Sequence, residues 1–208
     1  DKSFNWSGIA GKTITDYGVI NQNSPFFIAS IDKLYNSTIA LLLYEQSKID
    51  LDDTLDKYLP LSFIDKIHFH KGINFSNKIT IRHLLSHTSG IADWLEDYPK
   101  SGKTIVDKIL SEGDKFFDIS EICEYVSTEL KPHFEPQDFS KSKLKVRYSD
   151  TNFILLIAII EAVCGKPLSL IYDEMLFKPF SIKNTFFADN SITESNTNIS
   201  IPLSAEGK

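Results

Sequence analysis

The sequence predicts an α+β fold in which a few short strands precede a mostly helical region. Short apolar stretches, broken by glycine and polar turns, fill residues 4–28 and have the pattern of strands joined by turns. From residue 30 onward, apolar residues recur at helical spacing, beginning with Ile31, Leu34 and Tyr35. The chain is therefore expected to be a single domain over 1–208, with sheet strands in 1–29, a helix over 30–47 and a mostly helical region over 48–187.

Further helices are expected over residues 79–85, 119–130, 151–163 and 168–177. Thr80 suits the N-cap of the first of these, Gly90 suits the turn that follows it, and Gly165 suits the end of the third. No strands return after the helices, and a sheet of two or three strands is marginal by itself. We therefore expect an incomplete fold, with sheet strands missing at one or both ends.

Composition and charge exclude several classes of function. The chain of 208 residues is 42% hydrophobic, which is ordinary for a soluble globular protein, and its net charge of -6 argues against a nucleic-acid surface. The longest apolar stretch, 153–160, is too short to span a bilayer, and residues 1–6 are too polar for a signal peptide. Cys123 and Cys164 are expected to be two buried thiols rather than a disulfide scaffold.

Two further motifs are poor candidates for function. Gly-Lys-Thr occurs at 11–13 and 102–104, but neither copy has the glycine five residues earlier that a P-loop needs. His83 and His87 are four residues apart and could share a helix face, as zinc ligands do. Leu84 stands where a metalloprotease has its glutamate, so helix-end histidines bonded to the backbone are the favoured interpretation. We expect no metal and no cofactor.

The pair Ser30 and Lys33 is the first candidate for chemistry. Residues three apart lie on one helix face, so the serine Oγ and the lysine Nζ can meet. Burial would lower the pKa of the lysine and allow it to take the proton of a serine nucleophile. The spacing also occurs at Ser140 and Ser142, but only Ser30 follows an apolar run and opens an apolar helix. An N-cap serine with a solvated lysine is the alternative.

Tyr148 is the second candidate, because it ends a polar loop directly before the apolar helix 151–163. That position can direct a side chain into a cleft at the N-terminus of a helix. A tyrosine near a lysine cation can serve as a general base or acid. The alternative is a core tyrosine with Asp150 or Thr151 capping the helix.

Four stretches in this order resemble the serine β-lactamase and penicillin-binding-protein superfamily. Residues 26–33 look like its Ser-x-x-Lys nucleophile motif, and 48–53 resemble the segment after that helix. Residues 79–90, Ile-Thr-Ile-Arg-His-Leu-Leu-Ser-His-Thr-Ser-Gly, are similar to a family hallmark, and 148–153 look like the Tyr-x-Asn motif in its Tyr-Ser-Asp variant. The branch that the chain resembles comprises class C β-lactamases, D-alanyl-D-alanine carboxypeptidases and family VIII esterases.

The resemblance implies a β-lactamase/transpeptidase-like fold, in which an antiparallel sheet is flanked by helices beside a mostly helical subdomain. It also implies that Ser30 attacks an acyl carbonyl of a small-molecule or peptide substrate, while Lys33 and Tyr148 share its proton. Half of the oxyanion hole would come from the Ser30 backbone N–H and half from a late strand. Family likeness further implies a periplasmic or secreted protein.

Two departures from the family pattern shape the functional expectation. The third motif of the family, Lys-Thr-Gly or His-x-Gly on a late strand, is absent from the sequence. Asp150, the expected substrate-binding residue, replaces the amide with which class C β-lactamases hold substrate. A carboxypeptidase or esterase activity is therefore expected at least as strongly as β-lactamase activity. A non-catalytic binding or regulatory protein on the same scaffold is the alternative.

Overall fold

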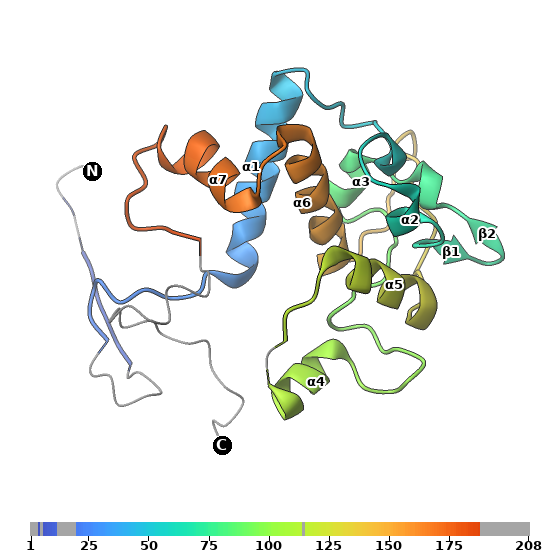
Figure 1. The fold of residues 1–208 in the computed structure, drawn as a ribbon, viewed down its shortest axis with the longest axis horizontal. Helices are drawn as coiled ribbons and strands as arrows, with labels where there is room; N and C mark the ends of the chain where they lie inside the picture. The colour runs from blue at the N-terminus through green and yellow to red at the C-terminus, as the bar shows by residue number, and fades with distance from the viewer. Residues whose placement is uncertain (1–3, 5, 12–19, 114, 188–208) are drawn as a thin grey trace. The chain divides into compact units, whose positions relative to one another are not determined.

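The computed structural model describes residues 4, 6–11, 20–113 and 115–187 of the chain (Figure 1). It divides into two compact units. The first holds the described residues up to Asp32 and from Asn184, and the second runs from Lys33 to Lys183.

The first unit contains the residues that lead to Ser30. None of the described residues 4, 6–11 and 20–28 lies in a regular strand, and Phe26 makes an isolated bridge. The prediction of sheet strands in 1–29 stays a prediction, because residues 12–19 lie outside the described part. Ser30 is exposed in the short 3-10 helix η1 (Ala29–Ile31), and Ala29 enters it with a left-handed φ of 47°.

The second unit is mostly helical, as expected, and one small hairpin interrupts it (Figure 1). The first helix, α1 (Asp32–Glu45), begins at the last residue of the first unit. The elements that follow it in chain order are η2 (Leu55–Lys57), α2 (Leu61–Ile64), β1 (Phe69–His70), β2 (Ile73–Asn74), η3 (Ser76–Lys78), α3 (Ile81–Leu85), α4 (Ile105–Glu112), α5 (Ile119–Glu129), α6 (Asp150–Cys164), α7 (Leu168–Tyr172) and η4 (Asp173–Phe177).

Local sequence explains where several helices begin. Thr80 caps α3 as expected, and His83 completes the capping box by accepting a hydrogen bond from the Thr80 backbone N–H. The helix α4 was not expected, although Thr104 and Asp107 form a capping box of the same kind at its start. Capping by Asp118 likewise fixes the start of α5. These caps satisfy backbone N–H groups that would otherwise lack partners at the first turn.

Three helices end in a Schellman motif whose left-handed residue is not glycine. After α1, the Ser47 N–H bonds the Tyr44 carbonyl and the Lys48 N–H bonds the Leu43 carbonyl. After α3, the same two bonds run from His87 to Leu84 and from Thr88 to His83, and His87 has a φ of 54°. The third motif has Ser181 in this position. The left-handed residue that ends α3 is therefore His87. Gly90, which we expected to suit the turn after this helix, also has a positive φ, of 75°.

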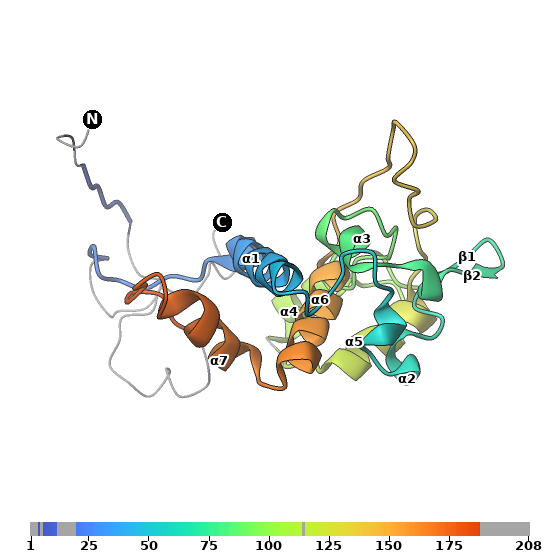
Figure 2. The same cartoon turned by 90° about the horizontal axis from the view of Figure 1, so that it is seen from above.

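The helix α6 forms the centre of the second unit, where it packs against α3, α5 and α7 (Figures 1 and 2). Its central residues Leu155, Leu156, Ile159 and Ile160 are fully buried. Gly165 takes the left-handed conformation that ends α6, as expected. Burial of this apolar helix stabilises the second unit.

Two smaller findings complete the fold. Phe69 pairs with Asn74 and His70 with Ile73 in the antiparallel hairpin β1–β2. Among the described residues, no single helix is long and apolar enough to cross a membrane, although α6 together with Leu168–Phe177, bent by 76°, has the necessary length and composition.

Candidate active site

Lys33, Tyr148 and Asp150 meet in the second unit. The Lys33 ammonium, in the first turn of α1, forms an ion pair of 2.5 Å with the Asp150 carboxylate at the start of α6. Its Nζ also lies 5.3 Å from the centre of the Tyr148 ring and 5.6 Å from that of Phe153. The side chains of the ion pair are 16% and 18% exposed. Two predicted catalytic residues and the predicted substrate-binding residue thus form one group.

This ion pair determines the charge of Lys33. Burial lowers the pKa of Lys33, but the hydrogen bonds and negative charge offered by Asp150 and Tyr148 outweigh burial and raise the pKa above its usual value. The expectation of a lowered lysine pKa is therefore wrong, since it counted burial and not the carboxylate. Lys33 is an ammonium at neutral pH and cannot accept a proton from Ser30 in this state.

Ser30 lies in η1, and chain connectivity places it three residues before Lys33. The other two serines with the same spacing to a lysine, Ser140 and Ser142, lie in an exposed loop outside any helix or strand. Of the three serines, only Ser30 therefore leads into a helix, α1, and this helix carries Lys33.

The segment that carries Tyr148 is held by the loop after α3. Thr151 donates a hydrogen bond of 2.7 Å to the Ala92 carbonyl and accepts one of 3.0 Å from the Trp94 backbone N–H. The Ser149 hydroxyl, also buried, donates to the same carbonyl at 3.2 Å. These bonds fix the start of α6, where Asp150 lies.

His87 also contacts this segment. Its ring stacks on that of Tyr148, with 4.6 Å between the ring centres and an angle of 28°. Its Nδ1 accepts hydrogen bonds of 3.2 Å from the Ser149 backbone N–H and from the Asn152 side-chain amide. Burial and the positive charge of Lys33 lower the pKa of His87, which keeps the ring neutral and able to accept these bonds.

The Asp97 carboxylate holds Arg147, the residue directly before Tyr148. Asp97 accepts hydrogen bonds of 2.7 Å from Arg147 and 2.6 Å from His133, and it also accepts the Asp93 backbone N–H at 2.7 Å. Burial raises the pKa of Asp97, but these bonds outweigh it and lower the pKa below its usual value. Asp97 therefore stays ionised and ties Arg147 to the loop after α3.

The remaining histidines bind the backbone of the loop between α5 and α6. This is the interpretation that the sequence favoured for helix-end histidines, and the structure confirms it for His83. The partners are the Phe134 carbonyl for His68, the Pro132 carbonyl for His70 and the Gln137 carbonyl for His83. Within the described part of the chain, no three His, Cys, Asp or Glu side chains lie close enough together to hold a metal ion.

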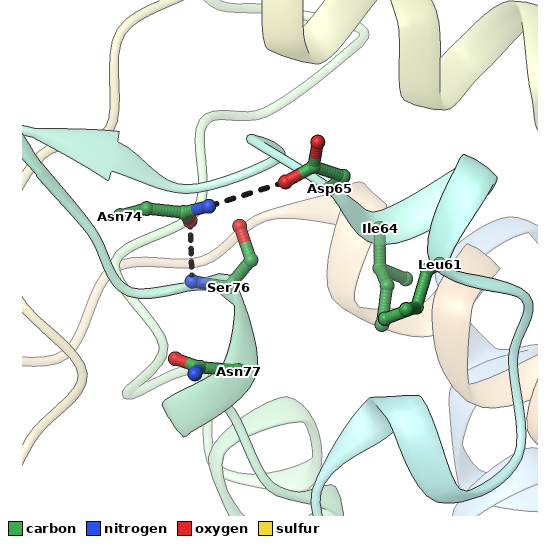
Figure 3. Close-up of a pocket in the computed structure, with 6 residues that line it drawn as sticks. All are labelled: Leu61, Ile64, Asp65, Asn74, Ser76 and Asn77. Carbon is green, nitrogen blue, oxygen red and sulfur yellow. Dashed lines mark hydrogen bonds between the residues drawn. The ribbon is translucent and has the colours of Figure 1, made fainter.

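A small pocket of about 240 Å³ lies elsewhere in the second unit, between α2 and η3 (Figure 3). It is lined by Leu61, Ile64, Asp65, Asn74, Ser76 and Asn77. Asn74 donates to the Asp65 carboxylate at 3.3 Å and accepts the Ser76 backbone N–H at 3.0 Å, so these polar groups bind one another (Figure 3). The pocket contains none of the predicted site residues, and it carries no functional argument.

Sequence reasoning missed Asp93 and Asp97, and it treated His87 only as a possible zinc ligand or a helix-end histidine. Asp93 is buried next to the start of α6, and burial raises its pKa. No local pattern distinguishes these residues, because their roles depend on contacts with a segment far away in the chain. The one available signal was the position of His87 inside the hallmark segment 79–90.

Known sequences resemble this chain over most of its length. The Beta-lactamase family model matches residues 8–200. Penicillin-binding protein 4* of Bacillus subtilis is 27% identical over 180 residues, which cover 83% of this chain and 32% of that protein. A putative D-alanyl-D-alanine carboxypeptidase of Salmonella typhimurium is 32% identical over 168 residues, which cover 79% of this chain and 34% of that protein.

Solved structures agree with these sequence matches. EstCE1, a hydrolase with promiscuous acyltransferase activity, superposes with a TM-score of 0.62 at 27% identity over 84% of this chain and 42% of that one. A D-stereospecific amidohydrolase from Streptomyces sp. gives 0.59 at 28% identity, over 74% of this chain and 42% of that one.

The helical region, the small antiparallel sheet and these neighbours define a β-lactamase/transpeptidase-like fold, which confirms the predicted fold class. The chain belongs to the Beta-lactamase family. It spans about a third of the length of the curated relatives it matches.

Proposed function

We propose that this chain carries the nucleophile and proton-transfer residues of a serine hydrolase that works through an acyl-enzyme on Ser30. The observation that supports the proposal most strongly is the meeting of Lys33 and Tyr148, with 5.3 Å between the Lys33 Nζ and the ring centre. These are the two residues that a Ser-x-x-Lys and Tyr-x-Asn pattern requires side by side. An N-cap serine with a solvated lysine would not need a tyrosine at this place.

Tyr148 is the proton acceptor in this proposal. Lys33 already carries a proton, because Asp150 holds it as an ammonium. In the proposed step the Tyr148 oxygen, as a phenolate beside the Lys33 ammonium, takes the proton of the attacking Ser30 hydroxyl. Tyr148 returns this proton to the leaving group when the carbonyl–leaving-group bond breaks, and water then releases the acyl group from Ser30.

The proposed substrates are peptides that end in D-alanyl-D-alanine, esters and β-lactams, in keeping with the names of the relatives. Asp150 places a carboxylate beside the site, and this charge disfavours a substrate with its own carboxylate in contact with it. A β-lactam and a peptide that ends in D-alanyl-D-alanine both carry such a carboxylate, so we propose ester hydrolysis ahead of either. The periplasm or the cell exterior is the proposed compartment.

Covalent labelling tests the proposal. The protein is incubated with a fluorescent penicillin and, separately, with a fluorophosphonate, and the labelled peptide is identified by mass spectrometry. We expect an adduct on Ser30, none in Ser30→Ala, and labelling that is about 10² to 10⁴ times slower in Tyr148→Phe, as for loss of a general base.

Ser140→Ala and Ser142→Ala are matched controls, because each removes a serine with the same spacing to a lysine. Both variants are expected to label at the wild-type rate. Wild-type protein that takes up neither probe would overturn the proposal and favour a non-catalytic binding protein on the same scaffold.

A further inference from the structure

We infer that His87 is a positioning residue for Tyr148, acting through contacts to three consecutive residues. Its carbonyl oxygen accepts the Arg147 backbone N–H at 3.0 Å, its ring stacks on Tyr148 at 4.6 Å, and its Nδ1 accepts the Ser149 backbone N–H at 3.2 Å. The catalytic consequence of this inference rests on the proposed function.

The backbone of His87 is itself fixed. Its left-handed φ of 54° belongs to the Schellman motif at the end of α3, whose hydrogen bonds run from His87 to Leu84 and from Thr88 to His83. Because α3 packs against α6, the ring of His87 is held by the same helices that hold the Tyr148 segment. The position of Tyr148 is therefore set from outside its own loop.

The hydrogen bonds define the chemical state of the ring. A backbone N–H can only donate, so Nδ1 of His87 carries no proton and the other ring nitrogen does. The Asn152 amide donates to the same Nδ1, and its oxygen accepts the Ser89 hydroxyl at 2.6 Å. Asn152 and Ser89 are both fully buried. His87 is thus joined to the buried residues Ser89 and Asn152 by hydrogen bonds that a change of side chain would break.

Three substitutions separate the contributions of the side chain. His87→Asn keeps an acceptor at the same distance from the backbone and tolerates the left-handed conformation, but it removes the ring. His87→Phe keeps a ring and removes the acceptor. His87→Gly removes both and leaves the helix end unstrained. A buried N–H without an acceptor costs more than a lost ring stack, so we expect His87→Phe to be more damaging than His87→Asn.

The test combines crystal structures with kinetics. With the substrate hydrolysed fastest among the proposed classes, we expect kcat to fall by about 30- to 100-fold in His87→Gly and His87→Phe, with KM changing less than about threefold, and by less than about fivefold in His87→Asn. In the crystal structure of His87→Gly, we expect the Tyr148 ring to move by more than about 1 Å.

His83→Ala is the matched control. His83 belongs to the same motif and also binds the loop before α6, at the Gln137 carbonyl, and its ring packs against Phe139 instead of stacking on Tyr148. We expect this variant to lose stability while kcat stays within about threefold of wild type.

An unmoved Tyr148 ring in His87→Gly would overturn the inference, and so would an equal loss of kcat in His83→Ala. If the wild-type protein hydrolyses nothing, the proposed function fails, and the crystal structures alone still decide whether His87 positions Tyr148.

Discussion

Replacing Asp150 by asparagine tests the ion pair at the centre of the site. The Lys33 ammonium and the Asp150 carboxylate are 2.5 Å apart, and their side chains are 16% and 18% exposed. Two unit charges about 4 Å apart attract by about 4 kcal/mol at an effective dielectric constant of about 20, and desolvation offsets part of this. Asparagine keeps an oxygen acceptor, so we expect Asp150→Asn to lower the free energy of unfolding by about 2 kcal/mol.

Urea unfolding at neutral pH measures this loss, and Asp52→Asn is the matched control. Asp52 pairs with Arg82 at 2.7 Å, but those side chains are 66% and 38% exposed, and such pairs contribute about 1 kcal/mol or less. Because the folded-state pKa of Lys33 is raised above 10.5, the contribution of the Asp150 pair is complete below pH 10.5 and is lost as the pH rises through the folded-state pKa. If Asp150→Asn costs no more than Asp52→Asn, the argument for a buried ion pair is refuted.

Three other predictions concern stability and reactivity. Gly90→Ala should destabilise the fold by more than about 4 kcal/mol in urea unfolding, because φ is +75° and a Cβ would overlap the Phe134 carbonyl. The control Gly102→Ala, in open space at φ +107°, should cost about 1 to 3 kcal/mol. Equal losses in the two variants would contradict the overlap at Gly90. Burial lowers the folded-state pKa of His83 below 6.5, so the unfolded chain takes up the proton first and the free energy of unfolding falls as the pH drops below 6.5. His83→Gln should reduce this loss of stability between pH 7.5 and 5.5. An unchanged loss in the variant would show that His83 is not its source. Burial raises the pKa of Cys123 to about 12, so iodoacetamide at pH 8 should label this thiol at least about 100-fold more slowly in folded than in urea-unfolded protein. Similar labelling rates in the two states would show that the thiol is accessible in the folded protein.

Local patterns predicted most helices of the second unit. Apolar spacing predicted α5, α6 and the segment of α7 and η4 to within a few residues, because these faces are buried in one core. The helix α4 was missed, since residues 91–118 lack a clear apolar period, although the Thr104 and Asp107 capping box was a usable signal. The short hairpin β1–β2 has too few residues for an alternating pattern to be recognised.

The site could be predicted only in part. Motif order indicated Lys33, Tyr148 and Asp150, and the structure brings these three together. The direction in which the pKa of Lys33 shifts could not be predicted, because it depends on the carboxylate of Asp150, far away in the chain. The contacts of His87 could not be predicted either, because they join residues far apart in the chain. Its left-handed conformation gave no signal, since such a residue at a helix end is usually expected to be glycine or asparagine.

The mass of the peptide that contains Ser30 is the most direct test of the proposed acyl-enzyme. After incubation with a fluorophosphonate, this peptide should gain the mass of one adduct in wild-type protein and none in Ser30→Ala. Tyr148→Phe should slow the gain by about 10² to 10⁴, because the proton acceptor is lost. A wild-type peptide with unchanged mass, or a Tyr148→Phe variant that labels at the wild-type rate, would contradict the proposed roles of Ser30 and Tyr148.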